Sequence, residues 1–501
     1  MTTLHMNPSS IDDYRKFIAI KSLPSYSCRG REMTFPDEYN GQILGKKAKP
    51  RPTNWEPSPF LFDYQRDITM MALRKRKYAI FADCGAGKTL MFLEWCNAVR
   101  GMLPKSKRLL IVSPLMVCPQ TIDENAKWYS HAGYPIEHVR SADLDSWLGG
   151  EGGIGIANYD ALTDEITQKN LGAMVLDESS MLKSHYGKWG QKCIELGRGL
   201  NFKLACTGTP APNDRIEYAN HAVFLDHFPT VNSFLARFFI NRGQTQNRWE
   251  LKQHALAGFY RALSHWCIFL TNPATYGWKD NTQPLPPINV HIDHVPLTPE
   301  QSKIVRTMTG NLVVTGLGGI TSRSTFSQLA KGVFKGEYVP TRKFTFIKGL
   351  VDSFGDKSTI IWCHFNDEQD RVAAMFPDAA NIDGSTPVSK RIALIDDFKS
   401  RRRRVLISKP KILGFGLNLQ VATKQVFSGL QDSYEEYYQA VKRSNRYGAT
   451  EPLDVHIPVT ELEEPFVENV LRKAGNIARD TEEQERIFRE YGYLDGLAST
   501  N

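Results

Sequence analysis

A glycine-rich stretch, FADCGAGKTL, runs from Phe81 to Leu90 and follows a short apolar segment. A buried strand that leads through such a turn into a helix gathers backbone N–H groups around one point, where the helix dipole adds positive charge. Gly85 and Gly87 allow positive φ and a close approach to an anion. Lys88 can reach nucleotide phosphates, and the hydroxyl of Thr89 can ligate Mg²⁺. The stretch predicts a phosphate-binding turn; the alternative is a flexible turn with an incidental lysine.

Two adjacent carboxylates, Asp177 and Glu178, follow the apolar residues of AMVLDESSMLKS. This places them at the C-terminal end of a predicted buried strand, the edge where open α/β sheets bind ligands. Asp177 would hold Mg²⁺, often through water, and Glu178 would polarise an attacking water. The alternative is that the pair lies in a solvated loop.

Short apolar runs that alternate with amphipathic segments must position these residues, and they predict parallel strands with crossover helices. In the first region the predicted strands are Tyr78–Ala82, Leu109–Ser113, Ile154–Ala157, Met174–Leu176 and Lys203–Cys206. In a second region they are Thr359–Trp362, Val405–Ser408, Gln425–Ser428 and Val455–Ile457. The stretch 215–275 is rich in aromatics and is predicted to be helical, and the prolines of PLPPINV mark a linker. The fold class is therefore α/β.

The composition is that of an ordinary soluble chain, with 501 residues, 41% hydrophobic and 23% charged. Residues 461–501 hold ten acidic and five basic side chains, so the net charge of +8 leaves +13 on the rest, which suits a polyanionic partner. The eight cysteines are scattered without a C-x-x-C pair, which argues against a zinc ribbon or a disulfide framework. No run approaches the roughly 18 apolar residues of a membrane span, and no secretory signal is evident, so we expect a cytoplasmic protein.

The two motifs belong to a longer series that resembles, in order, the motifs of superfamily-two helicases, and most of all the Swi/Snf-type DNA translocases in a compact, phage-like form. The glycine turn fits that superfamily's A-x-x-G-x-G-K-T, beginning at Ala82. LFDYQ resembles L-x-x-Y-Q, whose glutamine, here Gln65, reads the adenine edge. IVSPLMV resembles motif Ia, which contacts the DNA backbone. LDESSMLKS stands in the place of motif II, and TGTPAPN (Thr207–Asn213) closely matches motif III.

The second half of the chain continues the series. PLPPINVHIDHVPLTPEQSKIV resembles the segment that joins two lobes, with L-T-x-x-Q at Leu297, Thr298 and Gln301, and IIWCHF resembles motif IV. GFGLNLQ (Gly414–Gln420) resembles motif V. QAVKRSNRYG (Gln439–Gly448) matches motif VI, Q-A-x-x-R-x-x-R-x-G, at every fixed position. The resemblance covers roughly residues 57–475.

Three departures from the family pattern stand out. Ser180 occupies the place where the family usually has a histidine that helps couple nucleotide state to motif III. Ile412-Leu413-Gly414 replaces A-G-G in motif V, and IFLTNPATYG lacks the Arg-Arg pair often found before the linker. The chain is therefore an outlying member of the family.

The resemblance implies two RecA-like lobes of parallel sheet flanked by helices, with ATP and Mg²⁺ as cofactors between them. The implied nucleotide-binding residues are Gln65, Gly85, Ala86, Gly87, Lys88, Thr89 and Gln439, and the implied Mg²⁺ ligands are Thr89 and Asp177. The candidate catalytic residues are Lys88, Glu178, Arg443 and Arg446. The candidate DNA contacts are Ser113, Gly414 and Asn418.

Arg443 and Arg446 lie three residues apart, so on a helix they would share one face. A guanidinium brought close to a transferring phosphoryl group stabilises its developing charge, an effect of about 10³–10⁵ in rate. Because these arginines belong to the second lobe, catalysis would require the two lobes to close. The alternative is that the arginines merely solvate a helix face.

The expected organisation has six parts. These are 1–55, an N-terminal extension and linker; 56–225, the first RecA-like lobe; 226–285, a helical insertion; 286–350, the inter-lobe linker and a helical segment; 351–460, the second RecA-like lobe; and 461–501, an acidic helical tail. The helical spacing of Phe466, Val470, Leu471 and Ala474 predicts that the tail packs back on a lobe, although it could instead recruit a partner.

Three functions remain open at this point. The first is an ATP-driven translocase on duplex DNA, which would grip phosphates without reading sequence. The second is a strand-separating or annealing helicase of replication or recombination. The third is a nucleic-acid-binding regulatory module with weak ATPase activity. DNA is the expected partner in each case, with duplex favoured, RNA not excluded and no role for a membrane.

Overall fold

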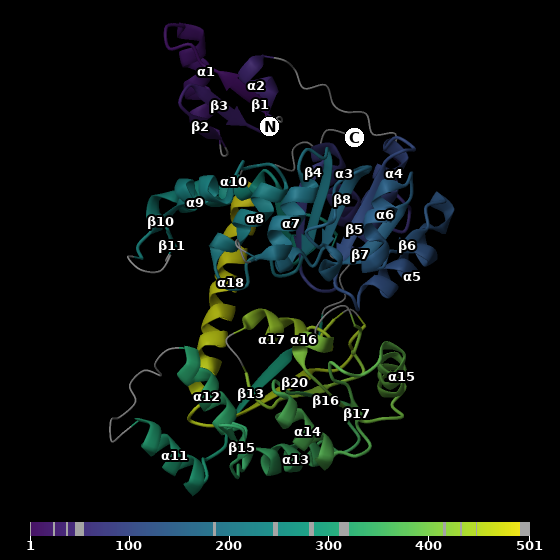
Figure 1. Ribbon diagram of the computed structural model, residues 1–501, viewed down its shortest axis with the longest axis vertical. Helices are drawn as coiled ribbons and strands as arrows, with labels where there is room; N and C mark the ends of the chain where they lie inside the picture. The colour runs from purple at the N-terminus through teal and green to yellow at the C-terminus, as the bar shows by residue number, and fades with distance from the viewer. Residues whose placement is uncertain are drawn as a thin grey trace. The chain divides into compact units, whose positions relative to one another are not determined.

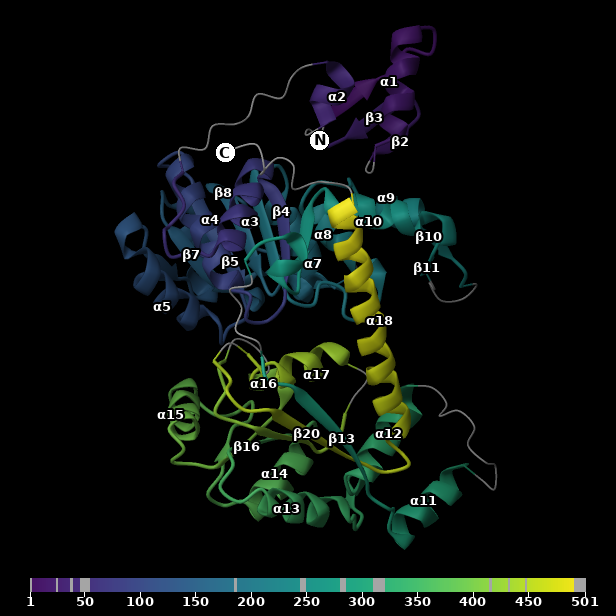
Figure 2. The ribbon, with the colours of Figure 1, turned by 180° about the vertical axis from the view of Figure 1, so that it is seen from behind.

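The computed structural model describes residues 2–23, 26–36, 39–45, 55–183, 187–243, 249–279, 285–309, 320–413, 417–430, 433–446 and 448–490. The chain divides into two compact units: unit 1 is Met1–Thr282 with Ala478–Asn501, and unit 2 is Gln283–Ile477. Each unit holds one large parallel sheet with helices on both of its faces, as the α/β prediction requires (Figure 1 and Figure 2).

Unit 1 contains a seven-stranded sheet of order β12-β4-β9-β8-β5-β7-β6, in which every pair is parallel. The strands are β4 (Lys77–Ala82), β5 (Arg108–Ser113), β6 (Ile136–His138), β7 (Ile154–Asn158), β8 (Leu171–Asp177), β9 (Phe202–Thr207) and β12 (Cys267–Leu270). The crossover and flanking helices are α3 (Asp63–Lys75), α4 (Lys88–Met102), α5 (Cys118–Tyr129), α6 (Leu144–Gly149), α7 (Lys188–Gly197), α8 (Tyr218–Phe224), α9 (Val231–Phe238) and α10 (Leu256–Ser264). All five strands predicted for this region are confirmed.

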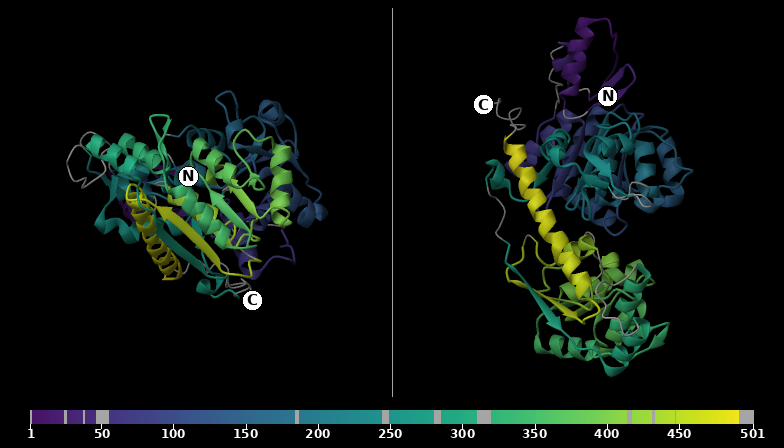
Figure 3. Two further views of the ribbon diagram at one scale, coloured as in Figure 1. Left: turned by 90° about the horizontal axis from the view of Figure 1, so that it is seen from below. Right: turned by 90° about the vertical axis from the view of Figure 1, so that its left-hand side faces the viewer.

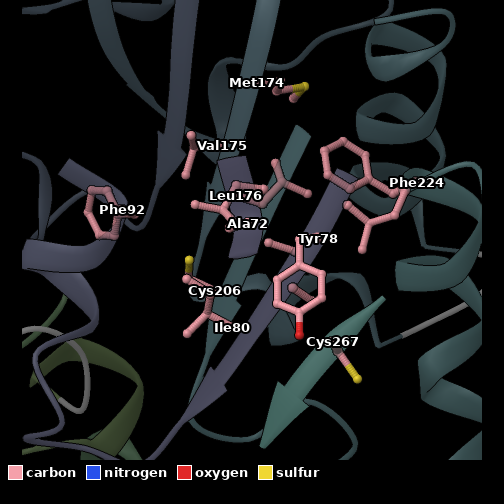
Figure 4. Packing of buried hydrophobic residues seen from close by; sticks show 14 of the residues in the cluster. Ala72, Tyr78, Ile80, Phe92, Met174, Val175, Leu176, Cys206, Phe224 and Cys267 are labelled. Atoms are coloured by element: carbon pink, nitrogen blue, oxygen red, sulfur yellow. The ribbon is translucent and has the colours of Figure 1, made fainter. Parts of the chain in front are cut away.

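The core of unit 1 forms around the central strands of this sheet. Figure 4 shows Ile80 of β4, Leu176 of β8 and Cys206 of β9 in one cluster. Phe92 of α4 lies on one side of the strands and Phe224 of α8 on the other. Strands that are covered on both faces must be apolar throughout, which explains the continuous hydrophobic runs in the sequence.

The prediction that residues 215–275 are wholly helical is wrong. Residues Cys267–Leu270 form β12, which pairs in parallel with β4 and places Ile268 opposite Ile80. A second departure is a short antiparallel hairpin of β10 (Phe239–Asn241) and β11 (Trp249–Leu251). Four buried apolar residues look the same to periodicity in a helix or a strand, so pairing with β4 decides between them.

The first 45 residues contain a small folded module rather than only an extension. Its elements are β1 (Thr2–His5), α1 (Ile11–Lys21), β2 (Ser27–Arg29), β3 (Glu32–Phe35) and α2 (Asn40–Leu44), with the strands in the antiparallel order β1-β3-β2. Phe35 and Ile20 are fully buried in its core. The module is attached to the rest of unit 1 by a hydrogen bond between Tyr39 and His265 and by Arg237 Nη2, which donates to Leu23 O over 2.8 Å.

Unit 2 contains a six-stranded, all-parallel sheet of order β13-β20-β19-β16-β18-β17. Its strands are β13 (Ile288–His294), β16 (Thr359–Trp362), β17 (Ala380–Asn381), β18 (Val405–Ser408), β19 (Lys424–Phe427) and β20 (Leu453–Val459). Its helices are α11 (Pro299–Thr309), α12 (Ile320–Ala330), α13 (Lys343–Ser353), α14 (Asn366–Met375), α15 (Val388–Lys399), α16 (Pro410–Leu413) and α17 (Tyr434–Val441), and a hairpin joins β14 (Val333–Phe334) to β15 (Glu337–Tyr338). The four strands predicted for this unit are confirmed.

The segment expected to be the inter-lobe linker and a helical segment also contributes a strand to unit 2. Strand β13 lies at the edge of the sheet, beside β20. The L-T-x-x-Q element that follows is a capping box at the start of α11: Gln301 N donates to Thr298 Oγ1 over 3.2 Å, and Thr298 N donates to Gln301 Oε1 over 3.0 Å. Gln301 Nε2 also donates to Leu329 O over 2.7 Å, which fixes α11 against the end of α12. The spacing of this element therefore has a local structural cause.

Helix α18 (Glu464–Glu490) runs unbroken through 27 residues (Figure 3). Its first half belongs to unit 2, where Val467 and Val470 are buried in the core, and its second half belongs to unit 1, where Ile487 and Phe488 are buried. The prediction of a helix that packs by its apolar face is confirmed, except that Leu471 is 39% exposed.

A buried charge cluster anchors the start of α18 in unit 2. Glu463 accepts a hydrogen bond from Lys331 Nζ at 2.9 Å and another from Lys343 Nζ at 2.5 Å, and all three side chains are fully buried. The two ammonium groups lower the pKa of Glu463 to about 2, against the effect of burial. Removing one member of such a cluster leaves an uncompensated buried charge, so these residues hold α12, α13 and α18 together.

All eight cysteines are free thiols. Among the helices that the structure describes, none is both long enough and apolar enough to cross a bilayer.

Candidate functional site

The glycine turn joins β4 to α4, which begins at Lys88. Gly85 and Gly87 have φ of +93° and +75°, the left-handed region that favours glycine. A Cβ on Gly87 would also lie 2.2 Å from Gln65 Nε2, so space as well as backbone angle requires glycine. Lys88 Nζ donates to Ala82 O at 2.8 Å and to Asp83 O at 3.2 Å, so the ammonium group lies within the turn. This is the geometry of a phosphate cradle.

Gln65 lies directly against that turn, as its predicted role in nucleotide binding requires. It sits on α3, is 2% exposed, and accepts a hydrogen bond from Phe62 N at 3.0 Å. The neighbouring Tyr64 donates from its hydroxyl to Ala86 O at 3.1 Å. Helix α3 is therefore attached to the turn at two points, an attachment that the sequence motif L-x-x-Y-Q does not reveal by itself.

Asp177 ends β8, where two hydrogen bonds hold its carboxylate and a third holds its backbone carbonyl. Ser113 Oγ donates to Asp177 Oδ2 at 2.9 Å, Glu178 N donates to Asp177 Oδ1 at 3.0 Å, and Tyr159 Oη donates to Asp177 O at 2.8 Å. Burial, with the charge of Glu178 next to it, raises the pKa of Asp177 to about 7. A buried carboxylate of this kind gains from a bound cation, because the cation replaces the lost hydration.

Glu178 has a backbone conformation that is uncommon for its residue type, with φ +49° and ψ +52°. Its Oε2 accepts a hydrogen bond from Thr207 Oγ1 at 3.3 Å. Thr207 opens motif III, so the hydroxyl links the carboxylate of motif II to the next loop. Backbone strain of this sort, which costs about 1–3 kcal/mol, is concentrated at functional sites.

Strand order explains why these motifs meet. Strand β9 lies between β4 and β8, so the loop after β9, which is motif III, lies between the glycine turn and motif II. The contact is close: a Cβ on Gly208 would lie 3.5 Å from Lys88 Nζ and 3.7 Å from Cys84 Sγ. The ends of three neighbouring parallel strands thus bring lysine, carboxylates and hydroxyls to one edge of the sheet.

The residues present fit a magnesium nucleotide. Asp177 is 6% exposed at this edge, and Thr89 stands in the first turn of α4 beside Lys88. Within the described ranges, no group of three or more His, Cys, Asp or Glu side chains gathers to form a cage for a metal ion. Mg²⁺ commonly binds through one or two protein oxygens together with substrate phosphates, and Thr89 and Asp177 can supply those oxygens.

Ser113 requires a correction. It was expected to contact the DNA backbone, but it is fully buried and its hydroxyl donates to Asp177. Strand β5 lies beside β8 in the sheet, so the last residue of β5 faces the last residue of β8. Its position makes Ser113 a support of the carboxylate.

The two candidate arginines lie in unit 2, and the prediction that they share a helix face is wrong. Helix α17 ends at Val441, and Arg443 and Arg446 lie in the turn that follows. Gln425 Nε2 of β19 donates to Ser444 Oγ at 2.8 Å, and Asn445 Nδ2 donates to Pro286 O at 2.7 Å. These two bonds hold the turn against β19 and the segment that precedes β13.

The arginine turn contacts motif V. Leu419 N donates to Arg443 O at 2.9 Å, and Arg446 Nη1 approaches Leu417 O at 3.5 Å. The two side chains differ in environment, because Arg443 is only 3% exposed whereas Arg446 is half-buried. The described part of motif V is therefore packed against motif VI within unit 2.

The remaining predicted residues have different outcomes. Gln439 lies on α17, is 3% exposed, and its Nε2 donates to Glu435 Oε1 of the same helix at 3.4 Å. Asn418 is exposed beside the arginine turn, where a contact with nucleic acid is sterically possible. Gly414 lies outside the described residues. The roles of these three residues stay predictions.

Comparison with known proteins agrees with the site. The SNF2-related domain model matches residues 64–339, and the helicase conserved C-terminal domain model matches residues 342–448. A putative protein, p41, of Acyrthosiphon pisum secondary endosymbiont phage 1 is 23% identical over 410 residues, which cover 76% of this chain and 87% of that protein.

The mouse DNA annealing helicase and endonuclease ZRANB3 is 25% identical over 422 residues, which cover 79% of this chain but only 38% of the mouse protein. Among solved structures, Dbp5 of S. cerevisiae bound to RNA and ADP BeF3 superposes with a TM-score of 0.50 at 14% identity, covering 91% of this chain and 97% of that one. This likeness supports the fold of two RecA-like sheets.

The matched SNF2-related region spans more than half of the 501 residues, and the helicase C-terminal region follows it directly. The phosphate cradle, the paired carboxylates and the arginine turn lie within these two regions. The chain belongs to the SNF2-related family and is an enzyme of the superfamily-two helicase type, which uses nucleotide.

Proposed function

We propose that this protein is an ATP-dependent DNA motor that hydrolyses ATP with Mg²⁺ and moves along duplex DNA. The observation that carries the proposal is the meeting of Lys88, Asp177 and Thr207 at the edge formed by β4, β9 and β8. Membership of the SNF2-related family supports the same function.

Each residue at this edge has a distinct task. Backbone N–H groups of the glycine turn and Lys88 bind the phosphates, and Gln65 reads the adenine. Thr89 and Asp177 hold Mg²⁺, which when bound neutralises charge on the phosphate oxygens. Glu178 orients the attacking water and accepts its proton. The Thr207 hydroxyl holds the Glu178 carboxylate at one oxygen, which limits how that carboxylate can turn.

Unit 2 completes the catalytic group in this proposal. Arg443 and Arg446 approach the γ-phosphate when the two units close around ATP, and they stabilise the charge that develops during hydrolysis. Hydrolysis removes the ligand that bridges the units, so they reopen. Repeated closing and opening, with each unit holding phosphates of DNA, moves the protein along the duplex. Asn418 and Gly414 remain our candidates for the phosphate contacts of unit 2.

A strand-annealing activity is the second candidate. It is favoured by the likeness to ZRANB3, which is named as a DNA annealing helicase, although this chain covers only 38% of that protein. The same nucleotide site would drive either activity. RNA as an alternative substrate is tested together with DNA below.

The decisive experiment compares ATPase activity in the presence of duplex DNA, single-stranded DNA and RNA. We expect the largest stimulation with duplex DNA, and displacement of a triplex-forming strand that depends on ATP. Stimulation by single strands together with annealing of complementary strands would favour the second candidate. Absence of ATP hydrolysis with every nucleic acid would reject the motor and leave a binding module.

A further inference from the structure

The second residue after the catalytic carboxylates, Ser180, departs from the family pattern in this chain. The family usually has a histidine at the position of Ser180, and here the hydroxyl of Ser180 is buried with no hydrogen-bond partner among the described residues. Within the part of the chain that the structure describes, the Ser180 hydroxyl therefore provides no hydrogen bond from motif II to motif III. The neighbouring Ser179 is also fully buried, and its Oγ lies 3.0 Å from Nε2 of His221.

His221 comes from a different element, helix α8, and is fully buried. Its Nδ1 lies 3.4 Å from Glu217 O, one turn earlier in the chain. Because a carbonyl oxygen can only accept, Nδ1 carries the proton and Nε2 accepts from the Ser179 hydroxyl. Burial lowers the pKa of His221 to about 4, so the ring is neutral at physiological pH, in agreement with this arrangement.

The other end of the connection is motif III. The side chain of Glu217 accepts from Asn213 N at 3.0 Å and from Asn213 Nδ2 at 2.9 Å, and Asn213 is the last residue of TGTPAPN. His221 also packs edge-on against Phe81 of β4, with ring centroids 5.2 Å apart. One imidazole thus contacts Ser179 after motif II, the backbone of Glu217 and the strand that leads to the glycine turn. The side chain of Glu217 in turn holds Asn213 of motif III.

We propose that His221 is a positioning residue that couples motif II to motif III through Ser179, Glu217 and Asn213, in place of the family's histidine. We call these four residues the histidine bridge. The inference rests on the proposed ATP-driven function and adds to it a second route to motif III, beside the direct bond from Thr207 Oγ1 to Glu178. When Glu178 changes its contacts during hydrolysis, the adjacent Ser179 moves, and the imidazole transmits that movement to Glu217.

The first test replaces His221 with phenylalanine. His221→Phe keeps an aromatic ring against Phe81 and removes both hydrogen bonds of the imidazole. We expect the KM for ATP to stay within about twofold, while the stimulation of kcat by duplex DNA falls at least about fivefold, the lower end of typical coupling effects. His221→Gln, which retains a group able to bond Ser179 Oγ, should recover part of the stimulation.

The control is His227→Phe. His227 is buried in the same unit, its Nε2 lies 3.3 Å from Lys77 O, and its ring stacks on Trp266 with centroids 6.0 Å apart. Both of these partners lie outside motifs II and III. This variant reports the loss of a buried imidazole alone, and we expect wild-type stimulation from it. Equal stimulation in the two phenylalanine variants, both shown to be folded by their melting temperatures, would overturn the proposal.

A second readout needs no DNA and so separates this inference from the proposed function. Hydrogen exchange of residues 207–217 is measured with and without a non-hydrolysable ATP analogue. In the wild-type chain we expect nucleotide to slow exchange in this segment, and in His221→Phe we expect this protection to be lost. Protection that persists in the variant would overturn the bridge. Protection lost in the variant, in a chain that DNA does not stimulate, would reject the motor and support the bridge.

Discussion

Glu178 combines an unusual backbone conformation with a carboxylate that is tied to motif III. Its φ of +49° and its bond from Thr207 Oγ1 fix the side chain at the end of β8. Conformations of this kind persist only where the surrounding structure enforces them. This constraint supports our proposal that Glu178 acts in the chemical step while the glycine turn binds the nucleotide.

We predict that Glu178→Gln retains ATP binding and loses hydrolysis. The amide keeps the shape of the side chain but cannot accept the proton of the attacking water, so kcat should fall by about 10²–10⁴-fold with little change in KM. Steady-state ATPase assays and nucleotide binding by fluorescence measure the two effects. Glu165→Gln, at an exposed acid of the same unit, is the matched control and should resemble the wild-type chain. Hydrolysis by the Glu178 variant at the wild-type rate would contradict the assignment.

The titration of Glu217 makes the stability of the folded chain fall as the pH rises. Burial raises its pKa to about 7 from an ordinary value of 4.5, in opposition to the hydrogen bonds that Asn213 donates. Between these two pH values the folded chain holds a proton that the unfolded chain has released. The stabilisation that this proton contributes is complete below pH 4.5 and is lost as the pH rises to about 7.

Raising the pH should therefore lower the stability of the wild-type chain relative to that of the Glu217→Gln variant. The glutamine side chain does not titrate. Across this pH window the free energy of unfolding of the variant, minus that of the wild-type chain, should therefore rise by about 1.4 kcal/mol per pH unit. Urea unfolding of both proteins at pH 5 and pH 8 measures the shift, and taking the difference cancels the other titrating groups. A difference that is the same at both pH values would show that Glu217 is ionised throughout.

At the scale of single residues, the sequence predicts what is local and misses what depends on strand order. Lys88, Asp177 and Glu178 were found because each follows a recognisable apolar run. The role of Ser113 was not predicted, because its partner Asp177 lies 64 residues away in the sequence. The two residues meet only because β5 pairs with β8. His221 carried no signal at all, because a histidine in an aromatic-rich stretch looks like any buried histidine.

At the scale of elements, nine predicted strands are confirmed, and the four strands of the two large sheets that were missed, β6, β12, β13 and β17, all lie at a sheet edge. Strands β12 and β13 were missed because the first is four apolar residues among aromatic helices and the second follows a proline-rich run. Each is an edge strand that adds to a sheet already formed by distant segments. The placement of an edge strand depends on a partner that local sequence does not contain.

The capping box of α11 provides a test at this scale. Thr298→Ala removes the hydroxyl that accepts from Gln301 N, and Ala cannot replace that acceptor. We expect the free energy of unfolding of unit 2 to fall by about 0.5–2 kcal/mol. Lys303→Ala, at an exposed position of the same helix, should change it by less than about 0.5 kcal/mol. Denaturant unfolding measures both variants; equal effects would show that the box does not stabilise the helix.

At the scale of the whole molecule, two units are joined by the chain at residues 282–283 and again within α18. The halves of this helix are held in different ways. Near its start Val470 is fully buried in the core of unit 2, close to the cluster around Glu463. Near its end Phe488 packs against Phe269 and Tyr276 in unit 1, with ring centroids 6.4 Å apart in both cases.

Polar contacts reinforce the second half. Arg215 forms an ion pair with Asp480, Gln484 Nε2 donates to the Tyr218 hydroxyl at 3.2 Å, and Thr271 N donates to Glu485 Oε1 at 3.1 Å. The helix that the sequence suggested would pack on one lobe thus belongs to the cores of two. Each half should then contribute to the stability of its own unit.

Because of this separation, we expect two substitutions in one helix to destabilise different units. Phe488→Ala leaves a cavity in unit 1 and should lower the stability of that unit by about 3–5 kcal/mol, whereas Val470→Ala should lower that of unit 2 by a smaller amount because it removes less buried surface. Hydrogen exchange followed along β9 and β19 reports the two units separately. Glu490→Ala, at an exposed position of the same helix, is the control for both substitutions. Phe488→Ala could instead reduce the exchange protection of β19 as much as that of β9. The two halves of α18 would then be parts of one cooperative unit. In that case nucleotide binding in unit 1 would stabilise unit 2 without any contact from the arginines of unit 2.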